Sequence, residues 1–554
     1  MRDLDRLLRP KSVAVIGGGA WCANVLAQLQ KIGFAGDIWP VHPKRSDMGG
    51  LHTYASLDAL PSAPDAVFIG VNRNLTPWVV ADLADMGAGG AVCFAAGFQE
   101  AVAEDATGAD LQRTLLDAAG EMPIIGPNCY GFINALDGAA LWPDQHGCLR
   151  VETGVAIITQ SSNIAINLTM QERGLPLAYV MTAGNQAQIG FADLGIAALE
   201  DPRVTALGLH IEGMGDLRAL EALAARARTL GKSIVALKVG KSDQAQAATI
   251  SHTASLAGSD AGARALLRRL GIGQVDGLAD MLETLKLLHV CGPLASNRIA
   301  SMSCSGGEAS LIADTSVGTG LIFPPLNETQ SHDLRMALGP LVALANPLDY
   351  NTYVWGDAVA MGRVYTAMMD QSLAIGCVIA DFPRADRCDA SEWEDIITGV
   401  TAARDTKGVP MAIIGSLPET MPEPVAARLV ANGIVPFNGL REAVTAMDIA
   451  AQLGQVNAPH EPLALPIVPS DTITLTEADA KAKVCVPAVS LPPISRSLPL
   501  PPLRTSLPSM PQSMSSPSPP FRVSSPAPPA SVLSAALPVR SSAKPEPVTF
   551  SRST

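Results

Sequence analysis

Short apolar segments alternate with helical segments along most of the chain, and this alternation restricts the fold more than any other feature. The apolar run at residues 12–16 leads into three glycines at 17–19 and then into a helical pattern. Further strands of this first series are expected at residues 37–41, 66–71, 90–95 and 123–125. A repeated β–α order indicates parallel strands joined by right-handed helical crossovers. We therefore predict an α/β protein with doubly wound parallel sheets.

The same order restarts twice. A second series of strands is expected from residue 154 and a third from residue 298. A chain of 554 residues has room for about three or four domains. We expect domains at residues 1–147, 148–294 and 295–466, followed by a short segment at 467–483 in which a helix begins without a C-cap.

The composition changes abruptly after residue 483. Residues 484–554 contain 17 prolines and 17 serines, no glycine and a single acid. Such a segment buries too little apolar surface to form a core, so we expect a disordered C-terminal tail.

Charge and cysteine usage narrow the functional classes. The net charge of −13 argues against general nucleic-acid affinity. No apolar run reaches the length of a membrane span, and the charged start of the chain is unlike a signal peptide, so we expect a cytoplasmic protein with no membrane partner. The nine cysteines show no CxxC or Cys/His spacing, and we expect neither a disulfide framework nor a metal site.

Glycines at the end of the first strand indicate a phosphate-binding turn. Gly17, Gly18 and Gly19 would let a ligand approach the backbone at the start of a helix, and Lys44 would add positive charge. A structural turn and a solvated lysine are the alternatives. Cys22 replaces the third glycine of a dinucleotide fingerprint, so NAD binding is disfavoured.

Two further motifs carry chemistry. GPNCYG at residues 126–131 follows a strand and places the amide of Asn128 and the thiol of Cys129 at the carboxyl edge of a sheet. SHTASLAGSD at residues 251–260 places His252 among small side chains, which leaves its imidazole accessible, although a lone histidine is more commonly structural.

These motifs, with LHIEG at residues 209–213, resemble those of the NDP-forming acyl-CoA synthetases, the superfamily of the succinyl-CoA synthetase α subunit and the ADP-forming acetate–CoA ligases. The resemblance covers about residues 1–483. It implies a Rossmann-type CoA-binding domain followed by two flavodoxin-like domains. It also implies that CoA is bound by the first domain, with Gly17, Gly18, Gly19, Lys44, Asn128 and Cys129 as the candidate contacts.

The resemblance also assigns catalytic roles. His252 is the implied phosphate carrier and Glu212 its carboxylate partner, which would fix the imidazole tautomer. The turn TQSSN at 159–163 implies an anion site at Ser161, Ser162 and Asn163, although relatives commonly carry glycine where Ser162 stands. Cys304, in the third domain, is expected to be a packing thiol because the sequence places no histidine near it.

The implied activity is that of an acid–CoA ligase, acting on CoA and a carboxylic acid within a homo- or hetero-oligomer and using MgATP through an ATP-grasp half. Residues 475–483, LTEADAKAK, resemble the opening helix of an ATP-grasp domain. Either that half is a separate subunit, or the Pro/Ser tail is an out-of-frame translation, which we favour because the helical pattern stops abruptly. The alternatives are a CoA-binding regulatory or scaffold protein without turnover and, less favoured, an NAD(P)-dependent oxidoreductase.

Overall fold

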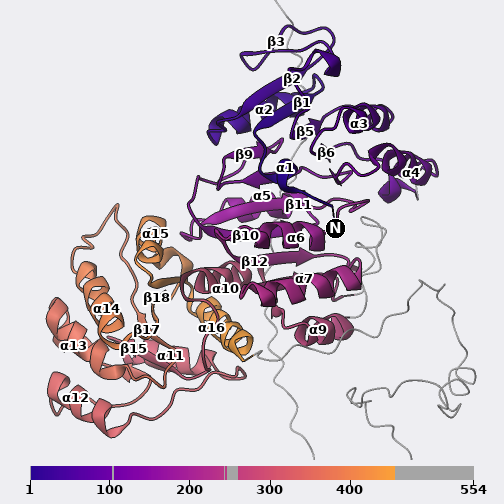
Figure 1. The fold of residues 1–554 in the computed structure, drawn as a ribbon. Helices are drawn as coiled ribbons and strands as arrows, with labels where there is room; N and C mark the ends of the chain where they lie inside the picture. Colours follow the sequence, from indigo (N-terminus) through magenta and orange to yellow (C-terminus); the bar gives the residue numbers. More distant parts are fainter. Residues whose placement is uncertain (1, 103–104, 243, 246–259, 456–554) are drawn as a thin grey trace, which may run out of the picture. The chain divides into compact units, whose positions relative to one another are not determined.

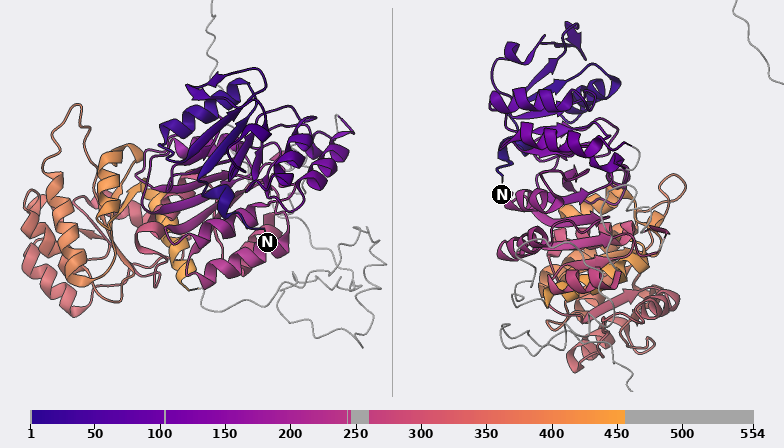
Figure 2. Two further views of the ribbon diagram at one scale, coloured as in Figure 1. Left: turned by 45° about the horizontal axis from the view of Figure 1, so that its top comes forward. Right: turned by 90° about the vertical axis from the view of Figure 1, so that its right-hand side faces the viewer.

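The computed structural model describes residues 2–102, 105–242, 244–245 and 260–455 (Figure 1). His252 and the expected segments at 467–483 and 484–554 lie outside the described residues. Three large sheets, two parallel and one mostly parallel, carry helices on their faces (Figures 1 and 2). The predicted α/β fold class, with its parallel sheets, is therefore confirmed. None of the helices in the described ranges is long and apolar enough to cross a membrane.

The first sheet has the strand order β2-β1-β5-β6-β7. Three of its central strands, β1, β5 and β6, are fully buried, which explains their continuous apolar sequences. The order reverses between β1 and β5, where the following loops diverge and leave room for a ligand. The elements of this domain are β1 (Ser12–Ile16), β2 (Asp37–Val41), β5 (Ala66–Ile69), β6 (Ala91–Cys93), β7 (Ile124–Ile125), the hairpin β3 (Asp47–Met48) and β4 (Leu51–His52), the helices α1 (Asp5–Leu8), α2 (Ala20–Lys31), α3 (Thr76–Asp85) and α4 (Gly108–Ala119), and the short helices η1 (Leu57–Ala59) and η2 (Gln99–Ala101).

The second sheet has seven strands in the order β14-β13-β12-β10-β11-β8-β9. Its parallel part repeats the order of the first sheet, with the reversal between β10 and β12. The elements are β8 (Phe132–Asn134), β9 (Ala139–Leu141), β10 (Gly154–Thr159), β11 (Leu177–Thr182), β12 (Val204–Ile211), β13 (Ser233–Lys238), β14 (Gly273–Val275), α5 (Ser162–Thr169), α6 (Phe191–Glu200), α7 (Leu217–Thr229), α9 (Asp260–Arg269) and α10 (Leu278–Cys291).

Two antiparallel strands of this sheet come from sequence assigned to the first domain. β8 pairs with β11, and β9 pairs with β8. The chain changes sheets at Gly131, whose φ of +104° and close approach to the carbonyl oxygen of Leu141 leave no room for a side chain. The change of sheet therefore lies before the expected domain boundary at 147/148, because β8 covers the backbone edge that β11 would otherwise expose.

The third sheet has the order β16-β15-β17-β18-β19 and is parallel throughout. It repeats the same reversal between β15 and β17. The elements are β15 (Ile299–Ser303), β16 (Leu348–Asp349), β17 (Ile375–Ile379), β18 (Met411–Gly415), β19 (Val435–Asn438), α11 (Gly306–Thr315), α12 (Glu328–Leu338), α13 (Ala358–Met368), α14 (Trp393–Lys407), α15 (Glu423–Ala431), α16 (Leu440–Gly454), η3 (Asn351–Val354) and η4 (Pro418–Thr420).

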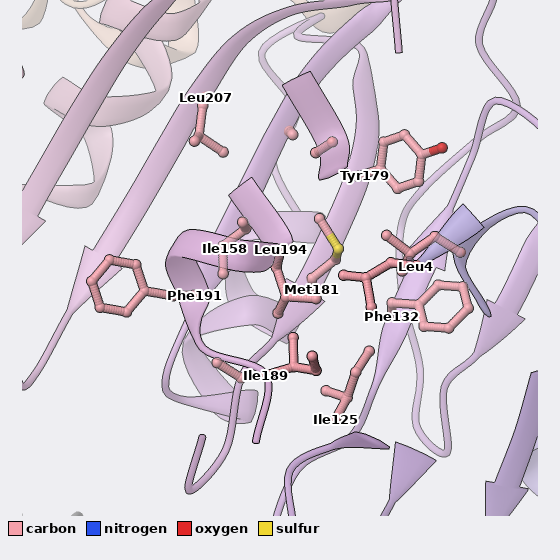
Figure 3. Packing of buried hydrophobic residues seen from close by; sticks show 14 of the residues in the cluster. Leu4, Ile125, Phe132, Ile158, Tyr179, Met181, Ile189, Phe191, Leu194 and Leu207 are labelled. Atoms are coloured by element: carbon pink, nitrogen blue, oxygen red, sulfur yellow. The ribbon is translucent and has the colours of Figure 1, made fainter. Parts of the chain in front are cut away.

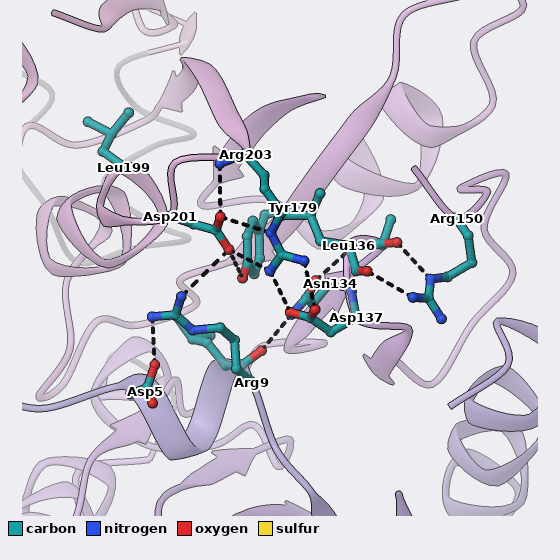
Figure 4. A network of polar contacts seen from close by, with 12 residues as sticks. Asp5, Arg9, Asn134, Leu136, Asp137, Arg150, Tyr179, Leu199, Asp201 and Arg203 are labelled. Carbon is teal, nitrogen blue, oxygen red and sulfur yellow. Dashed lines mark hydrogen bonds and ion pairs between the residues drawn. The ribbon is translucent and has the colours of Figure 1, made fainter. Parts of the chain in front are cut away.

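The first two domains share one hydrophobic core. Figure 3 shows Leu4 and Ile125 packed with Phe132, Met181 and residues of α6. A polar network accompanies this core (Figure 4). Arg203 binds the carboxylate of Asp137 at 2.9 and 3.0 Å and that of Asp201 at 2.8 Å, and Arg9 lies 3.6 Å from Asp201. The N-terminal segment is thereby fixed to the second domain.

Candidate active site

Elements of the first two domains border a cavity of about 720 Å³ at the carboxyl ends of their strands. It brings together six of the residues singled out in the sequence, from three separate motifs: Asn128, Cys129, Ser161, Ser162, Asn163 and Glu212. His252 lies outside the described residues, so its place relative to this cavity stays a prediction.

The turn between β10 and α5 is held by side-chain hydrogen bonds. Thr159 Oγ1 accepts from the backbone N–H of Ser161 at 2.9 Å and donates to its carbonyl oxygen at 3.0 Å. Ser161 is the N-cap of α5, and its hydroxyl accepts from the N–H of Ile164. Ser162 and Asn163 line the cavity and belong to the first turn of α5, where backbone N–H groups have no acceptor within the helix. This turn is chemically suited to an oxyanion.

The buried side chain of His210 contacts this turn through Thr159. His210 Nδ1 lies 3.2 Å from Thr159 Oγ1. Burial lowers the pKa of His210 to about 4, so this imidazole is neutral at pH 7. His210 therefore adds no positive charge to the anion site and acts as a hydrogen-bonding support.

Gln160 joins the anion turn to the loop that carries Glu212. Its Oε1 atom accepts from the N–H of Glu212 at 2.5 Å and from that of Gly213 at 2.9 Å, and its Nε2 atom donates to the carbonyl oxygen of Gly213 at 2.9 Å. The Gln160 side chain is buried. These three bonds fix the position of the Glu212 backbone relative to Ser161. Sequence reasoning placed Gln160 in the turn but did not foresee this clamp.

The carboxylate of Glu212 interacts electrostatically with Lys238, the last residue of β13. Burial lowers the pKa of Lys238, and the carboxylates of Asp260 and Glu212 oppose that shift. Asp260 ends the SHTASLAGSD motif and begins α9. Asp260, the last residue of the histidine motif, and Glu212 therefore both raise the pKa of Lys238.

The GPNCYG turn packs closely on the loop after β11. A Cβ atom at Gly184 would lie 2.5 Å from the carbonyl oxygen of Pro127, so only glycine fits there. The N–H of Asn185 donates to that same oxygen at 3.0 Å. Asn128 has a φ of +57° and is exposed at the cavity. The Nδ2 atom of its amide donates to Asn185 Oδ1 at 3.4 Å.

Cys129 does not present its thiol as the motif suggested. Its side chain is 2 % exposed, and its Sγ atom faces the carbonyl oxygen of Cys93 at 3.9 Å. Burial raises the pKa of this thiol. Any ligand contact of Cys129 would therefore involve its backbone.

The glycine turn and Lys44 are not among the residues that line this cavity. A Cβ atom at Gly18 would lie 2.5 Å from the imidazole of His42, and one at Gly17 would lie 2.7 Å from the carbonyl oxygen of Gly70. Lys44 is exposed. These residues follow β1 and β2 at the same carboxyl edge of the first sheet, and their contact with CoA stays a prediction.

Aromatic residues line the cavity on the side of the first domain. Phe94 follows β6 and Tyr130 is the fifth residue of the GPNCYG turn, and both border the cavity together with Asn185. Sequence reasoning missed Phe94 and Asn185. Phe94 carried one usable signal, since it lies near the carboxyl end of the parallel strand predicted at residues 90–95, at the edge where ligands bind.

A separate acidic group lies in the third domain. Burial raises the pKa of Glu308 to about 7, and the carboxylates of Asp381 and Asp349 act in the same direction. Cys304 is half-buried and packs against the hydrophobic core of this domain, as expected for a packing thiol. None of these four residues lines the cavity.

The first and second domains each match a known protein family. Residues 11–135 match the model of a CoA binding domain, and residues 152–288 match that of a succinyl-CoA ligase like flavodoxin domain. The chain is 32 % identical over 394 residues to a trans-feruloyl-CoA synthase from an unknown prokaryotic organism, an alignment that covers 70 % of this chain and 55 % of that protein. This chain thus spans about half the length of that relative.

Two further proteins match along nearly their whole length. The α subunit of acetate–CoA ligase (ADP-forming) II from Pyrococcus furiosus is 29 % identical over 423 residues, covering 73 % of this chain and 89 % of the subunit. The fold matches dinucleotide forming acetyl-coenzyme A synthetase 1 from Ca. Korarchaeum cryptofilum with a TM-score of 0.70 and 23 % identity, over 82 % of this chain and 97 % of that one.

Proposed function

Because the chain belongs, by its CoA-binding and succinyl-CoA ligase-like domains, to the NDP-forming acyl-CoA synthetase superfamily, we propose that it is the CoA-binding and phosphoryl-transfer part of an acid–CoA ligase. Its substrates are CoA and a carboxylic acid. The reaction takes place at the cavity of about 720 Å³ bordered by the first two domains.

One observation carries this proposal: a carboxylate, an oxyanion-binding turn and an exposed amide, from separate parts of the chain, border the same cavity. The three hydrogen bonds of Gln160 hold the backbone of Glu212 in a fixed position relative to the oxyanion-binding turn. A ligase that passes a phosphoryl group between a histidine and an acid needs a site for the moving phosphate and a partner for the imidazole.

The proposed reaction has three steps. A ring nitrogen of His252 takes the γ-phosphoryl group of ATP, and ADP leaves. The carboxylate of the acid then attacks this phosphorus, which breaks the phosphorus–nitrogen bond and gives an acyl phosphate. The CoA thiolate finally attacks the acyl carbon, and inorganic phosphate leaves.

The residues of the site have distinct roles in this scheme. The N–H groups of Ser162 and Asn163 hold the phosphate oxygens at the start of α5, where the helix dipole favours negative charge. Glu212 accepts a hydrogen bond from the opposite ring nitrogen of His252 and stabilises the positive charge that develops there. Asn128 binds CoA at the same edge.

An ATP-grasp half supplies the phosphoryl group in this proposal. The Pyrococcus furiosus relative is itself a single subunit of its enzyme, which supports a separate polypeptide as the source. Reading the DNA downstream of codon 483 in all three frames tests the other possibility, an ATP-grasp sequence displaced by a frameshift.

Phosphorylation of the full chain tests the proposal. With radiolabelled acetyl phosphate, or with labelled MgATP and an ATP-grasp partner, we expect an acid-labile, base-stable phosphoryl group. His252→Asn should abolish the label, Glu212→Gln should slow labelling about 10²-fold, and His332→Asn, which changes an exposed histidine of α12, should have no effect.

Calorimetric titration of each variant with CoA completes the test. We expect CoA to bind the wild type and His252→Asn equally. Label that persists in His252→Asn would refute the role of this histidine. CoA binding without any label in the wild type would instead support a regulatory CoA-binding protein.

A further inference from the structure

Three aromatic rings from separate parts of the first domain meet beside the cavity. Trp21, at the start of α2, lies with its ring centroid 5.4 Å from that of Phe94 and 6.1 Å from that of Tyr130, and the centroids of Phe94 and Tyr130 are 5.9 Å apart. The rings are mutually tilted by 45–50°. We call these three residues the aromatic wall.

Side chains behind the wall hold two of its rings in place. Phe68, fully buried, packs on Phe94 with centroids 5.6 Å apart, and Trp142, also fully buried, packs edge-on against Tyr130 at 5.5 Å. Burial and the nearby carboxylate of Asp144 raise the pKa of the Tyr130 hydroxyl. A flat group that packs on this wall therefore meets a preformed surface and orders few side chains on binding.

The wall lies at the reacting end of the site. Phe94 and Tyr130 border the same cavity as Glu212 and the anion turn. In CoA the adenine lies at the opposite end of the molecule from the thiol, and the thiol must reach an acyl phosphate at this turn. The group nearest the wall is therefore the part of the acid attached to its carboxyl carbon.

Aromatic side chains recognise another ring through apolar burial and through offset or edge-to-face contacts between rings. A methyl group, as in acetate, would cover little of a surface made by three rings. Resting on the function proposed above, we propose that the acid activated here carries an aromatic ring, which packs against Phe94 and Tyr130 with Trp21 at its edge.

Isothermal titration of the full chain with CoA, acetyl-CoA and benzoyl-CoA tests this substrate class. We expect benzoyl-CoA to bind about 10- to 100-fold more tightly than acetyl-CoA, the range that follows from burying one aromatic ring. Phe94→Leu keeps an apolar side chain against Phe68 but removes the ring. It should lower the preference for benzoyl-CoA by about tenfold and leave the affinity for CoA unchanged.

Two further variants keep the test decisive. Trp78→Leu changes an aromatic side chain that is 73 % exposed on α3 and does not line the cavity, and it should leave all three affinities unchanged. Tyr130→Leu serves as a second change to the wall if Phe94→Leu fails to show a wild-type circular dichroism spectrum, and it should lower the preference in the same way.

The outcomes separate this inference from the function on which it rests. Equal binding of benzoyl-CoA and acetyl-CoA would overturn the aromatic substrate class and leave the ligase proposal standing. An equal loss of affinity for CoA and both acyl-CoAs in Phe94→Leu would show that the wall binds the adenine, which also overturns the inference. No binding of CoA itself would refute the proposed function.

Discussion

A buried ionic network connects the second and third domains, and removing its lysine should destabilise the protein strongly. Lys286 of α10 is fully buried. Its Nζ atom lies 2.9 Å from the carboxylate of Glu283 and donates to Asn438 Oδ1 at 2.8 Å and to the carbonyl oxygen of Arg173 at 3.0 Å. Arg173 also binds Glu283 at 2.8 Å. Four residues from three parts of the chain are thus joined.

The expected cost follows from these contacts. Lys286→Met keeps the size of the side chain but leaves two acceptors without their donor, at about 1–3 kcal/mol each. It also leaves the buried carboxylate of Glu283 with one cationic partner in place of two. We expect a loss of about 3–5 kcal/mol in the free energy of unfolding, the range for breaking a buried ion pair from one side.

A double variant separates the ion pair from simple packing. Glu283→Leu combined with Lys286→Met removes both charges of the most buried pair, and it should cost less than the sum of the two single changes by about 2 kcal/mol or more. Arg226→Met serves as the control, because it breaks a 2.5 Å pair with Glu200 in which both side chains are about 40 % exposed. That change should cost about 1 kcal/mol or less.

Urea unfolding at pH 7, followed by far-ultraviolet circular dichroism, measures these differences on the full chain. Two results would contradict the reasoning. One is a Lys286→Met variant no less stable than Arg226→Met. The other is a double variant whose cost equals the sum of the single costs, since the two charges would then not depend on each other.

Two further changes test the site and the third domain. Gln160→Leu removes the three hydrogen bonds to the Glu212–Gly213 backbone. We expect phosphate labelling to slow about 10²-fold while the affinity for CoA is unchanged. A labelling rate equal to that of the wild type would show that these hydrogen bonds are dispensable. The pKa of Glu308 is raised to about 7 in the folded protein, so between the ordinary pKa of a glutamate and pH 7 the folded chain holds a proton that the unfolded chain has released. The free energy of unfolding should therefore fall as the pH rises through this range and level off above about pH 7. Glu308→Gln should therefore raise Tm relative to the wild type by a few degrees more at pH 8 than at pH 5, as measured by calorimetry, and an equal difference at both pH values would contradict the assignment.

Most of the fold was predictable from the sequence, because each buried parallel strand is a short apolar run bounded by a turn. β1 and β2 begin and end at the predicted residues, and β10 begins at residue 154 as predicted. β8 and β9 were missed for a physical reason. Each has three residues, and their pairing depends on contact with β11, about forty residues further along the chain, which no local pattern reports.

The site was predictable where a motif lies at the end of a strand. Ser161 and Glu212 were assigned from the resemblance of their motifs to a known family, and the structure places them after β10 and β12, neighbouring strands whose carboxyl ends meet. Side-chain direction was not predictable. Nothing in GPNCYG indicates that Cys129 points into the core while Tyr130 borders the cavity, because this depends on the turn at Asn128 and on packing against Gly184.

The β8–β9 hairpin has a consequence for how this chain can be divided or recombined. A cut before Phe132 would remove two strands from the second sheet and expose the backbone of β11 as an open edge, which invites aggregation. A cut after residue 147 would instead leave the hairpin attached to the first sheet without a partner. The piece that can be exchanged between proteins of this architecture is therefore the pair of domains, not the CoA-binding domain by itself.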